Sequence, residues 1–254
     1  MAAAGWRAVG GAMTRSLLSV EGISKKFGGL LAVDDATLRV DEHEIVGLIG
    51  SNGAGKTTLF NVISGDLKPT SGRVVFRQSE IQSLPAHRVC RLGIARTYQI
   101  VKPFAELTVL ENVMVGAFLH SARSGEVREQ ALHVLDVVGL FDRRNTIGRD
   151  LNLPQLKRLE LARSLATKPA LLLLDEVMSG LNPVESAKMV DLVQGIGTRG
   201  TTLLIIEHVM KAIMSLSHRV YVMNQGKVIA EGVPGDVVRN PDVIKSYLGT
   251  RAYA

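Results

Sequence analysis

The sequence predicts an α/β fold with a mostly parallel sheet that helices cover on both faces. Short apolar runs alternate with segments of helical periodicity, most clearly over residues 170–248, and this alternation is typical of buried parallel sheets. A block over about residues 100–166 shows helical periodicity only, so we interpret it as an insertion into the sheet domain. The preceding block, about residues 17–95, is rich in strand and turn patterns.

The first two blocks supply strands and then helices. Runs rich in apolar and β-branched residues, bounded by turn residues, indicate strands. They lie at residues 16–23, 31–40 and 44–50. Amphipathic helices are expected over residues 107–120 and 126–141.

A third helix of the inserted block is expected to begin at the stretch LNLPQ. Leu156, Leu159, Ala162 and Leu165 recur every three residues, which places them on one helix face. Pro154 is tolerated in the first turn because the N–H that it lacks has no partner there. The question is why this helix start carries an asparagine, a leucine and a proline.

The last block alternates strands and helices again. Residues 170–176 and 201–208 are apolar runs that indicate buried strands, and residues 184–196 show helical periodicity. A hairpin is expected over residues 220–232, followed by a short helix over residues 240–249.

Composition limits the classes of protein. Of the 254 residues, 46% are hydrophobic and 21% are charged, which suits one compact domain. The mean hydropathy is +0.18, yet no apolar run approaches the ~20 residues that cross a bilayer. The apolar excess fits either burial against partner proteins or a core rich in Leu and Val.

Charge and cysteine content narrow the setting. The net charge is +6, but the basic residues occur in scattered pairs without interleaved aromatics, so no nucleic-acid partner is expected. The single cysteine, Cys90, cannot form an internal disulfide, which fits a reducing, cytoplasmic compartment. Residues 1–16 lack the continuous apolar segment of a signal peptide and are expected to form a flexible extension.

The strongest local signal is Gly50-x-x-x-x-Gly55-Lys56-Thr57, the phosphate-binding P-loop pattern. An apolar strand precedes it and an amphipathic helix follows, which is the context that the motif requires. Gly53 and Gly55 allow backbone N–H groups to turn toward a phosphate chain at a helix N-terminus. Lys56 is expected to reach the β- and γ-phosphates and the Thr57 hydroxyl to bind Mg²⁺.

A second signal is the acid pair at the end of the apolar run LLLLDE, residues 171–176. Buried carboxylates are costly unless a cation or a reaction uses them. Asp175 is therefore expected to hold Mg²⁺, and Glu176 to polarise the water that attacks the γ-phosphate. An ordinary acidic pair at a strand end is the alternative.

Two further polar residues complete the pattern. His208 ends the apolar run TTLLIIEH, and a strand parallel to the preceding one would bring it to the same edge of the sheet. Gln99, in GIARTYQIVKPF, is an isolated amide that spacing alone would place on the surface.

The order of these motifs resembles the ATP-binding cassette (ABC) ATPases over essentially the whole chain. GSNGAGKTT matches the Walker A motif, Gln99 the Q-loop, LLLLDE the Walker B motif, SGLN at 179–182 the D-loop and His208 the switch histidine. Phe27 matches the aromatic residue that stacks on adenine, with packing inside the first sheet as the alternative.

The resemblance implies a P-loop NTPase (RecA-like) core with an antiparallel N-terminal β-subdomain and an inserted helical subdomain. A single domain over residues 17–250 would then divide into a core, 17–98 and 167–250, and a helical subdomain of about 99–166.

The resemblance also implies ATP and Mg²⁺ as cofactors. Glu176 would activate water, His208 would hold the γ-phosphate, and Gln99 would complete the catalytic set. Thr57, Gln99 and Asp175 would hold Mg²⁺. The implied nucleotide-binding residues are Phe27, Gly50, Ser51, Asn52, Gly53, Ala54, Gly55, Lys56, Thr57, Thr58, Asn152 and Gln155.

Finer stretches resemble the ATP-binding subunits of branched-chain (hydrophobic) amino acid importers: RLGIARTYQ, LTVLENVMVG, GLNPVE and RNPDVIKSYLG. This resemblance implies a second ATPase subunit, identical or different, closing head-to-tail over two ATP molecules. It further implies integral membrane permease subunits, indirect contact with a periplasmic or extracellular substrate-binding protein, and a peripheral location on the cytoplasmic face of the plasma (inner) membrane. The helical block would form much of the permease dock.

LNLPQ falls where the family carries its signature, usually LSGGQ. Asn152 can still donate through its amide, but Pro154 has no N–H and Leu153 adds a side chain where close approach is expected. A lost hydrogen bond to a phosphate costs about 1.5–3 kcal/mol, or about one to two orders of magnitude in rate. We therefore expect a weakened signature and a mixed dimer. The alternative is a tolerated variant with compensating donors.

Three other functions stay open at this point. One is the ATPase of another ABC import or export system, because the ATPase does not contact cargo. A low-turnover regulatory ATP-binding subunit fits LNLPQ. An ATP switch acting on ribosomes or DNA is less well supported, because such relatives usually carry two cassettes or a long coiled-coil insert.

Overall fold

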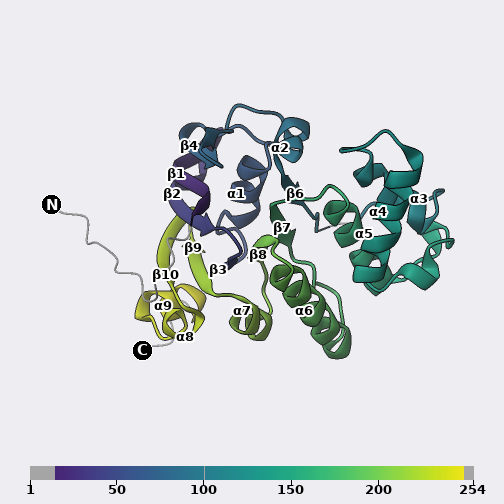
Figure 1. Ribbon diagram of the computed structural model, residues 1–254. Coiled ribbons are helices and arrows are strands. Elements are labelled where there is room, and N and C mark those ends of the chain that lie inside the picture. Colours follow the sequence, from purple (N-terminus) through teal and green to yellow (C-terminus); the bar gives the residue numbers. More distant parts are fainter. Residues whose placement is uncertain (1–14, 100, 249–254) are drawn as a thin grey trace.

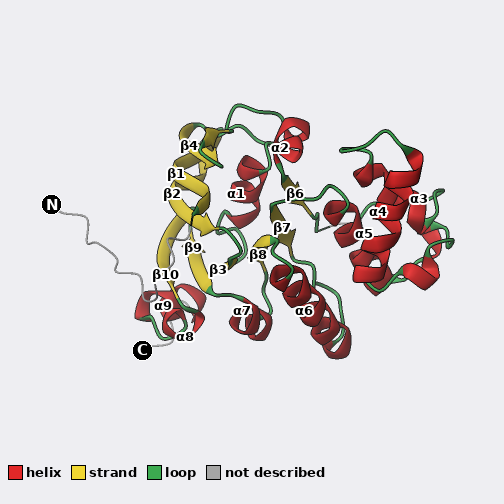
Figure 2. Ribbon diagram, viewed as in Figure 1, coloured by secondary structure: helices red, strands yellow, loops and turns green. Residues whose placement is uncertain are grey.

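The computed structural model describes residues 15–99 and 101–248 as two sheets with helices between and around them (Figures 1 and 2). The smaller sheet is antiparallel, in the order β2 (Leu30–Asp41), β1 (Ser16–Phe27), β4 (Ser71–Phe76), β5 (Ser79–Glu80). The larger sheet has the order β10 (Lys227–Gly232), β9 (Arg219–Asn224), β3 (Ile45–Gly50), β8 (Thr202–Ile206), β7 (Leu171–Asp175), β6 (Ile94–Arg96).

The helices lie between these strands in the chain. They are α1 (Lys56–Ile63), α2 (Ala86–Leu92), α3 (Val109–Ala117), α4 (Ser124–Val137), α5 (Leu153–Leu165), α6 (Pro183–Thr198), α7 (Met210–Leu216), α8 (Pro234–Val237) and α9 (Pro241–Leu248), with short 3₁₀ turns η1 (Phe141–Arg143) and η2 (Gly148–Asp150). Within residues 15–99 and 101–248, none of the helices combines the length and the hydrophobicity of a membrane span.

The larger sheet is parallel except at β10, and its register brings the chemistry-bearing loops together. Leu48 of β3 pairs with Ile206 of β8, which in turn pairs with Asp175 of β7. Parallel strands end at one edge of a sheet, so the loops that follow β3, β7 and β8 open at the same place. The predicted α/β fold with its parallel core sheet is confirmed.

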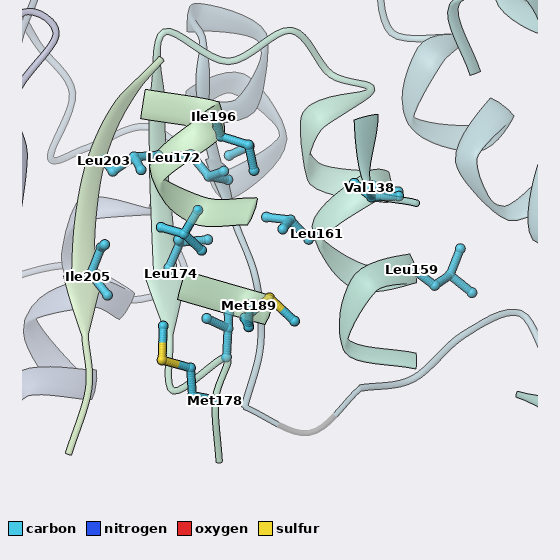
Figure 3. Packing of buried hydrophobic residues seen from close by; sticks show 14 of the residues in the cluster. Val138, Leu159, Leu161, Leu172, Leu174, Met178, Met189, Ile196, Leu203 and Ile205 are labelled. Carbon is cyan, nitrogen blue, oxygen red and sulfur yellow. The ribbon is translucent and has the colours of Figure 1, made fainter. Parts of the chain in front are cut away.

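Apolar side chains alternate between two cores on the two faces of this sheet. Leu172 and Leu174 of β7 pack on the face covered by α6, together with Leu203 and Ile205 of β8 (Figure 3). Their neighbours on the same strands point into a second core, where α1 lies between the two sheets. Both faces of the sheet are therefore buried, which explains why the central strands are uniformly apolar.

Helices α3, α4 and α5 form a lobe beside the sheets (Figure 1). The lobe lies between β6 and β7 in the chain, and these two strands pair directly from Ile94 and Leu171 onward. Thr108 begins α3 with a capping box, in which its hydroxyl accepts the N–H of Glu111 and the Glu111 carboxylate accepts the N–H of Thr108. The segment that carries α3, α4 and α5 therefore leaves the sheet at β6 and returns to it at the adjacent strand β7.

Several predicted elements differ in detail from the structure. The first strand runs on to Phe27, beyond the predicted 16–23. The predicted helix over 126–141 ends at Val137, because Gly139 takes a left-handed φ of 67° that stops it. The predicted strand over 201–208 ends at Ile206, so His208 lies in the following loop. Most of the predicted extension, residues 1–14, and residue 249 of the last predicted helix lie outside the described residues.

Candidate active site

The P-loop connects β3 to α1, and two of its glycines are needed for close packing. A Cβ on Gly50 would lie 2.2 Å from the main-chain oxygen of Met223. A Cβ on Gly55 would lie 2.4 Å from the main-chain oxygen of Ala32, and Gly55 has a φ of +101°. These two glycines therefore let the loop pass against β9 and β2, a reason beyond the phosphate approach expected from the sequence.

Gly53 has a different role in the same loop. Its φ is +81°, and no atom lies within 4 Å of the position that its Cβ would take. The loop is thus open on this side, and a ligand can approach its backbone directly. Gly55 is the N-cap residue of helix α1, and no side chain caps this helix start, so it can donate N–H groups to an anion.

Lys56 lies folded into the loop. Its Nζ donates to the main-chain oxygens of Gly50 (2.7 Å) and Ser51 (3.0 Å), and the residue is 5% exposed. Burial lowers the pKa of Lys56, and the charges of Glu176 and Asp175 oppose that decrease. The ammonium is thus held beside the acid pair by weak carbonyl acceptors that a phosphate can replace.

A cavity of about 980 Å³ opens over the P-loop. Most of the residues predicted from the sequence line it: Phe27, Asn52, Gly53, Ala54, Gly55, Lys56, Thr57, Thr58, Gln99, Glu176 and His208. Asp175 lines an adjoining cavity of about 580 Å³ together with Thr57 and Gln99. Gly50, Ser51, Asn152 and Gln155 line neither of these cavities.

Three predicted catalytic side chains meet at Glu176. Gln99 donates from Nε2 to Glu176 Oε2 at 2.6 Å, and His208 Nε2 lies 2.6 Å from Glu176 Oε1. The Glu176 side chain is 13% exposed and that of His208 is 40% exposed. Both carboxylate oxygens are therefore engaged on the cavity side. Gln99, which spacing alone would leave as a surface amide, belongs to this cluster.

Asp175 has another environment although it adjoins Glu176. It is 2% exposed, and its Oδ2 accepts a hydrogen bond from Arg96 at 2.7 Å. Burial raises the pKa of Asp175, while the guanidinium of Arg96 counteracts it. The sequence argument expected a cation beside this carboxylate, and a protein guanidinium occupies one side of it.

The second oxygen of Asp175 bears on the proposed metal. Oδ1 is buried and has no hydrogen-bond partner. A carboxylate oxygen left free beside the P-loop is the kind of donor that Mg²⁺ takes. In the part of the chain that the structure describes, no group of three or more His, Cys, Asp or Glu side chains is arranged to hold a metal ion, so a metal here would need ligands from a nucleotide as well.

Arg96 is a functional candidate that the sequence reasoning missed. Its side chain is 5% exposed, donates to Asn61 of α1 as well as to Asp175, and lies near the Phe60 and Tyr98 rings. It thus joins α1 to the end of β7. The only signal in the sequence is an arginine that directly follows a short apolar run.

Phe27 ends β1 at the mouth of the larger cavity. It is 45% exposed, and the Lys25 ammonium lies 5.2 Å from its ring centroid. The alternative of simple packing within the first sheet is not what the structure shows, because the ring is exposed and lines the cavity. A role in adenine stacking stays a prediction.

The helix start at LNLPQ binds its own backbone. Asn152 Oδ1 accepts the N–H of Gln155, and Gln155 Oε1 accepts the N–H of Asn152, both at 3.1 Å. Pro154 contributes no N–H, and Leu153 is 42% exposed. The capping box therefore uses two donors that an open helix start would offer to a ligand. The side-chain amide of Asn152 donates to no other group within residues 15–99 and 101–248.

Comparison with known proteins identifies the family of the chain. A family model described as ABC transporter matches residues 33–179, and one described as branched-chain amino acid ATP-binding cassette transporter matches residues 227–253. The chain is 41% identical to the high-affinity branched-chain amino acid transport ATP-binding protein LivG of Salmonella typhimurium, over 93% of this chain and 99% of the relative. It is 42% identical to BraF, a protein of the same description from Pseudomonas aeruginosa, with the same coverage.

Solved structures agree in fold. An ATP-binding cassette of an ABC transporter in its ADP conformation is similar with a TM-score of 0.84 and 31% identity, covering 93% of this chain and all of that one (100%). A dimeric bacterial ABC transporter cassette is similar with a TM-score of 0.77 and 25% identity, covering 85% of this chain and 98% of that one. The chain therefore belongs to the ATP-binding cassette (ABC) transporter family.

Proposed function

We propose that this chain is the ATP-binding and ATP-hydrolysing subunit of a transporter that imports branched-chain or other hydrophobic amino acids through partner membrane subunits. The observation that carries the proposal is the meeting of Gln99 and His208 at Glu176, beside the P-loop lysine Lys56. The relatives named for branched-chain amino acid transport support the choice of cargo.

The residues divide the chemistry among them. The open backbone at Gly53 and the start of α1 bind the phosphates, and Lys56 supplies a positive charge. Glu176 accepts the proton of the attacking water, and His208 contacts the γ-phosphate. Phe27 stacks on the adenine.

Thr57, Gln99 and Asp175 are the proposed Mg²⁺ residues. Asp175 would supply its free Oδ1, while Arg96 binds its other oxygen. When bound, Mg²⁺ would neutralise charge on the phosphate oxygens. Because Arg96 binds Oδ2, one oxygen of Asp175 is left for a metal ion.

The proposed partners are integral membrane permease subunits, a second ABC ATPase and, indirectly, a substrate-binding protein outside the cell. The chain would lie peripherally on the cytoplasmic face of the membrane. The exposed rings of Tyr98, Phe104 and Phe118, each between 44% and 48% exposed, support a dock that includes the helical lobe, because exposed aromatic side chains are typical of interaction surfaces.

LNLPQ favours a mixed dimer. The capping box occupies the N–H groups of Asn152 and Gln155, and Pro154 has none. A partner with an ordinary signature would complete the site on this chain's P-loop, and the second site would turn over slowly. The low-turnover regulatory subunit rests on the same observation. An export system is a further candidate, since the lipopolysaccharide export ATP-binding protein LptB of Haemophilus influenzae is 32% identical over 92% of this chain and 98% of that protein.

The test is a tagged pull-down of this chain from detergent-solubilised native membranes, with mass spectrometry of the chains that co-purify. Recovery of hydrophobic permease subunits and a second cassette ATPase is expected. Their identities would separate import from export. Recovery from the soluble fraction only, with ribosomal or DNA-bound proteins, would contradict the transporter proposal.

A further inference from the structure

A buried lysine outside the proposed catalytic set joins helix α5 to the two loops that carry Gln99 and Glu176. Lys157 lies about one turn into α5 and is 5% exposed. Its Nζ donates to the main-chain oxygen of Gln99 at 3.1 Å and to that of Glu176 at 3.2 Å. One ammonium group thus connects three segments that are far apart in the sequence.

The energetics of this contact argue against a purely structural role. A buried ammonium is costly, and burial lowers the pKa of Lys157 while nearby carboxylates, Glu207 first among them, oppose that change. An apolar side chain of similar length would fill the same space without this cost. The charged donor at position 157 is therefore best explained by the two main-chain oxygens that it binds.

What Lys157 holds is the backbone of the proposed base. Glu176 has a φ of +51°, a left-handed conformation that non-glycine residues adopt only when their surroundings impose it. The N–H of Glu176 donates to the main-chain oxygen of Ile206 at 2.9 Å, and its carbonyl accepts from Lys157 and from the N–H of Ser179. Both backbone polar groups of this residue are therefore fixed.

Lys157 also binds a second carbonyl, that of Gln99, and this links it to a pair of predicted catalytic residues. The side chains of Gln99 and Glu176 are hydrogen-bonded to each other at 2.6 Å, and Lys157 binds the main-chain oxygens of the same two residues. The ammonium group and the side-chain hydrogen bond together close a small ring of contacts. The distance between Gln99 and Glu176 is thus set by contacts of their backbones as well as of their side chains.

We propose that Lys157 is a positioning residue for the hydrolytic step, which keeps Gln99 and Glu176 at their working separation and ties both to helix α5. The inference rests on the proposed function, because it assigns Lys157 a part in ATP hydrolysis. Since α5 begins at LNLPQ, any displacement of that helix start moves the group that holds the two carbonyls.

The first test compares Lys157→Met with Lys157→Arg and with a control, Lys188→Met, at an exposed lysine on α6. Lys157→Met is expected to lower kcat by about tenfold to a hundredfold and to change the KM for ATP less than about threefold, because misplaced groups cost rate rather than binding. Lys157→Arg, which keeps the charge and several donors, is expected to recover most of the rate. A folded Lys157→Met variant with wild-type kcat would overturn the proposal.

The second test needs no turnover. Amide hydrogen exchange in Lys157→Met is expected to be faster in peptides covering residues 94–99 and 175–180 and unchanged over α6, because a lost anchor permits local opening. If Lys157→Met does not fold, Lys157→Leu, which also lacks a donor, is measured in the same way. Exchange that stays at the wild-type rate in a folded variant contradicts the proposed anchor.

The two tests separate this inference from the proposed function. A wild-type chain that binds no ATP and hydrolyses none would contradict the proposed function, whatever the exchange data show. A wild-type chain that hydrolyses ATP, with neither kcat nor exchange altered in Lys157→Met, would contradict the role of Lys157 alone.

Discussion

At the scale of single residues, the adjacent carboxylates of Asp175 and Glu176 have different surroundings. Asp175 is buried against the guanidinium of Arg96 and keeps one oxygen free. Glu176 turns into a left-handed conformation and meets Gln99 and His208 at the cavity. The change of backbone direction between the two residues is what separates a group suited to hold a metal from a group suited to react.

Lys56 offers a direct test of the phosphate site. Lys56→Ala should lower the affinity for ATP by at least about tenfold, because it removes a charge-assisted contact to phosphate worth about 1.5–3 kcal/mol. Isothermal titration calorimetry would measure the affinity, and circular dichroism would check the fold. Lys188→Ala, at an exposed position, is the matched control. Retained affinity in Lys56→Ala would exclude the lysine from nucleotide binding.

Glu207 provides a prediction on pH. This residue is 2% exposed, and burial raises its pKa even though its oxygens accept the N–H groups of Met178 and His208. A carboxyl group whose pKa is higher in the folded state binds more protons there, so its contribution to stability falls as the pH rises through the range between its unfolded and folded pKa values.

The pH effect is isolated by comparing the wild-type chain with Glu207→Gln. We expect the free energy of unfolding of the variant, relative to that of the wild type, to increase as the pH rises above the ordinary carboxyl pKa, because glutamine does not ionise. Urea unfolding at several pH values measures this difference. A difference that is constant with pH, or that moves in the opposite direction, would contradict a raised pKa.

At the scale of elements, helices α5 and α6 share one way of beginning. Each starts at an asparagine whose side chain accepts the N3 N–H, with a Gln or Glu side chain reaching back: Asn152 with Gln155, and Asn182 with Glu185. Each also carries a proline in its first turn. The same capping box is therefore expected to stabilise both helices to a similar extent.

Asn152→Ala and Asn182→Ala should each lower the free energy of unfolding by about 1 kcal/mol, the usual effect of losing an N-cap. Asn152→Ala should also lower ATP turnover of an assembled dimer, because its amide is placed at the signature segment. Urea unfolding and steady-state turnover give the two readouts. Wild-type turnover in Asn152→Ala would show that Asn152 caps the helix and does nothing more.

The elements also show what the sequence could and could not predict. Strands β3, β7 and β8 are buried on both faces, so their apolar runs were sufficient to predict them as buried strands. Helix α2 buries only Val89 and strand β4 only Val74 and Phe76, so neither has a periodic pattern to find. The division into a core and a helical subdomain, and the roles of the site residues, stay predictions.

Contacts between distant segments lay beyond reach of the sequence for a physical reason. The ion pair of Arg96 with Asp175 and the contacts of Lys157 with Gln99 and Glu176 depend on how strands and helices pack, since no local pattern links these positions. By contrast the P-loop and the acid pair are local motifs, and they were predicted together with their flanking strands.

At the scale of the whole molecule, the cavity opens at the edge where β3, β7 and β8 end, with the helical lobe beside it. LNLPQ starts a helix of that lobe but does not line the chain's own cavity. Its effect is therefore expected across a dimer. The mixed pair with a partner of ordinary signature should hydrolyse ATP about one to two orders of magnitude faster than the purified homodimer.

Steady-state ATPase assays of the two assemblies at equal concentration of sites measure this difference. Introducing glycine at position 154 of this chain, as Pro154→Gly, should raise homodimer turnover, because it adds a backbone N–H at the helix start. A homodimer that already hydrolyses ATP at the rate of the mixed pair would show that the donors lost at LNLPQ are compensated.

The most direct single measurement is Mg²⁺-dependent ATP turnover of the assembled transporter carrying Glu176→Gln, with ATP affinity measured on the same sample. We expect turnover to fall by at least about a hundredfold, since general-base groups contribute about 10²–10⁴-fold, while affinity stays near that of the wild type and an ATP-bound dimer accumulates. Unchanged turnover would remove Glu176 as the base, and a wild-type assembly without ATP hydrolysis would contradict the proposed function itself.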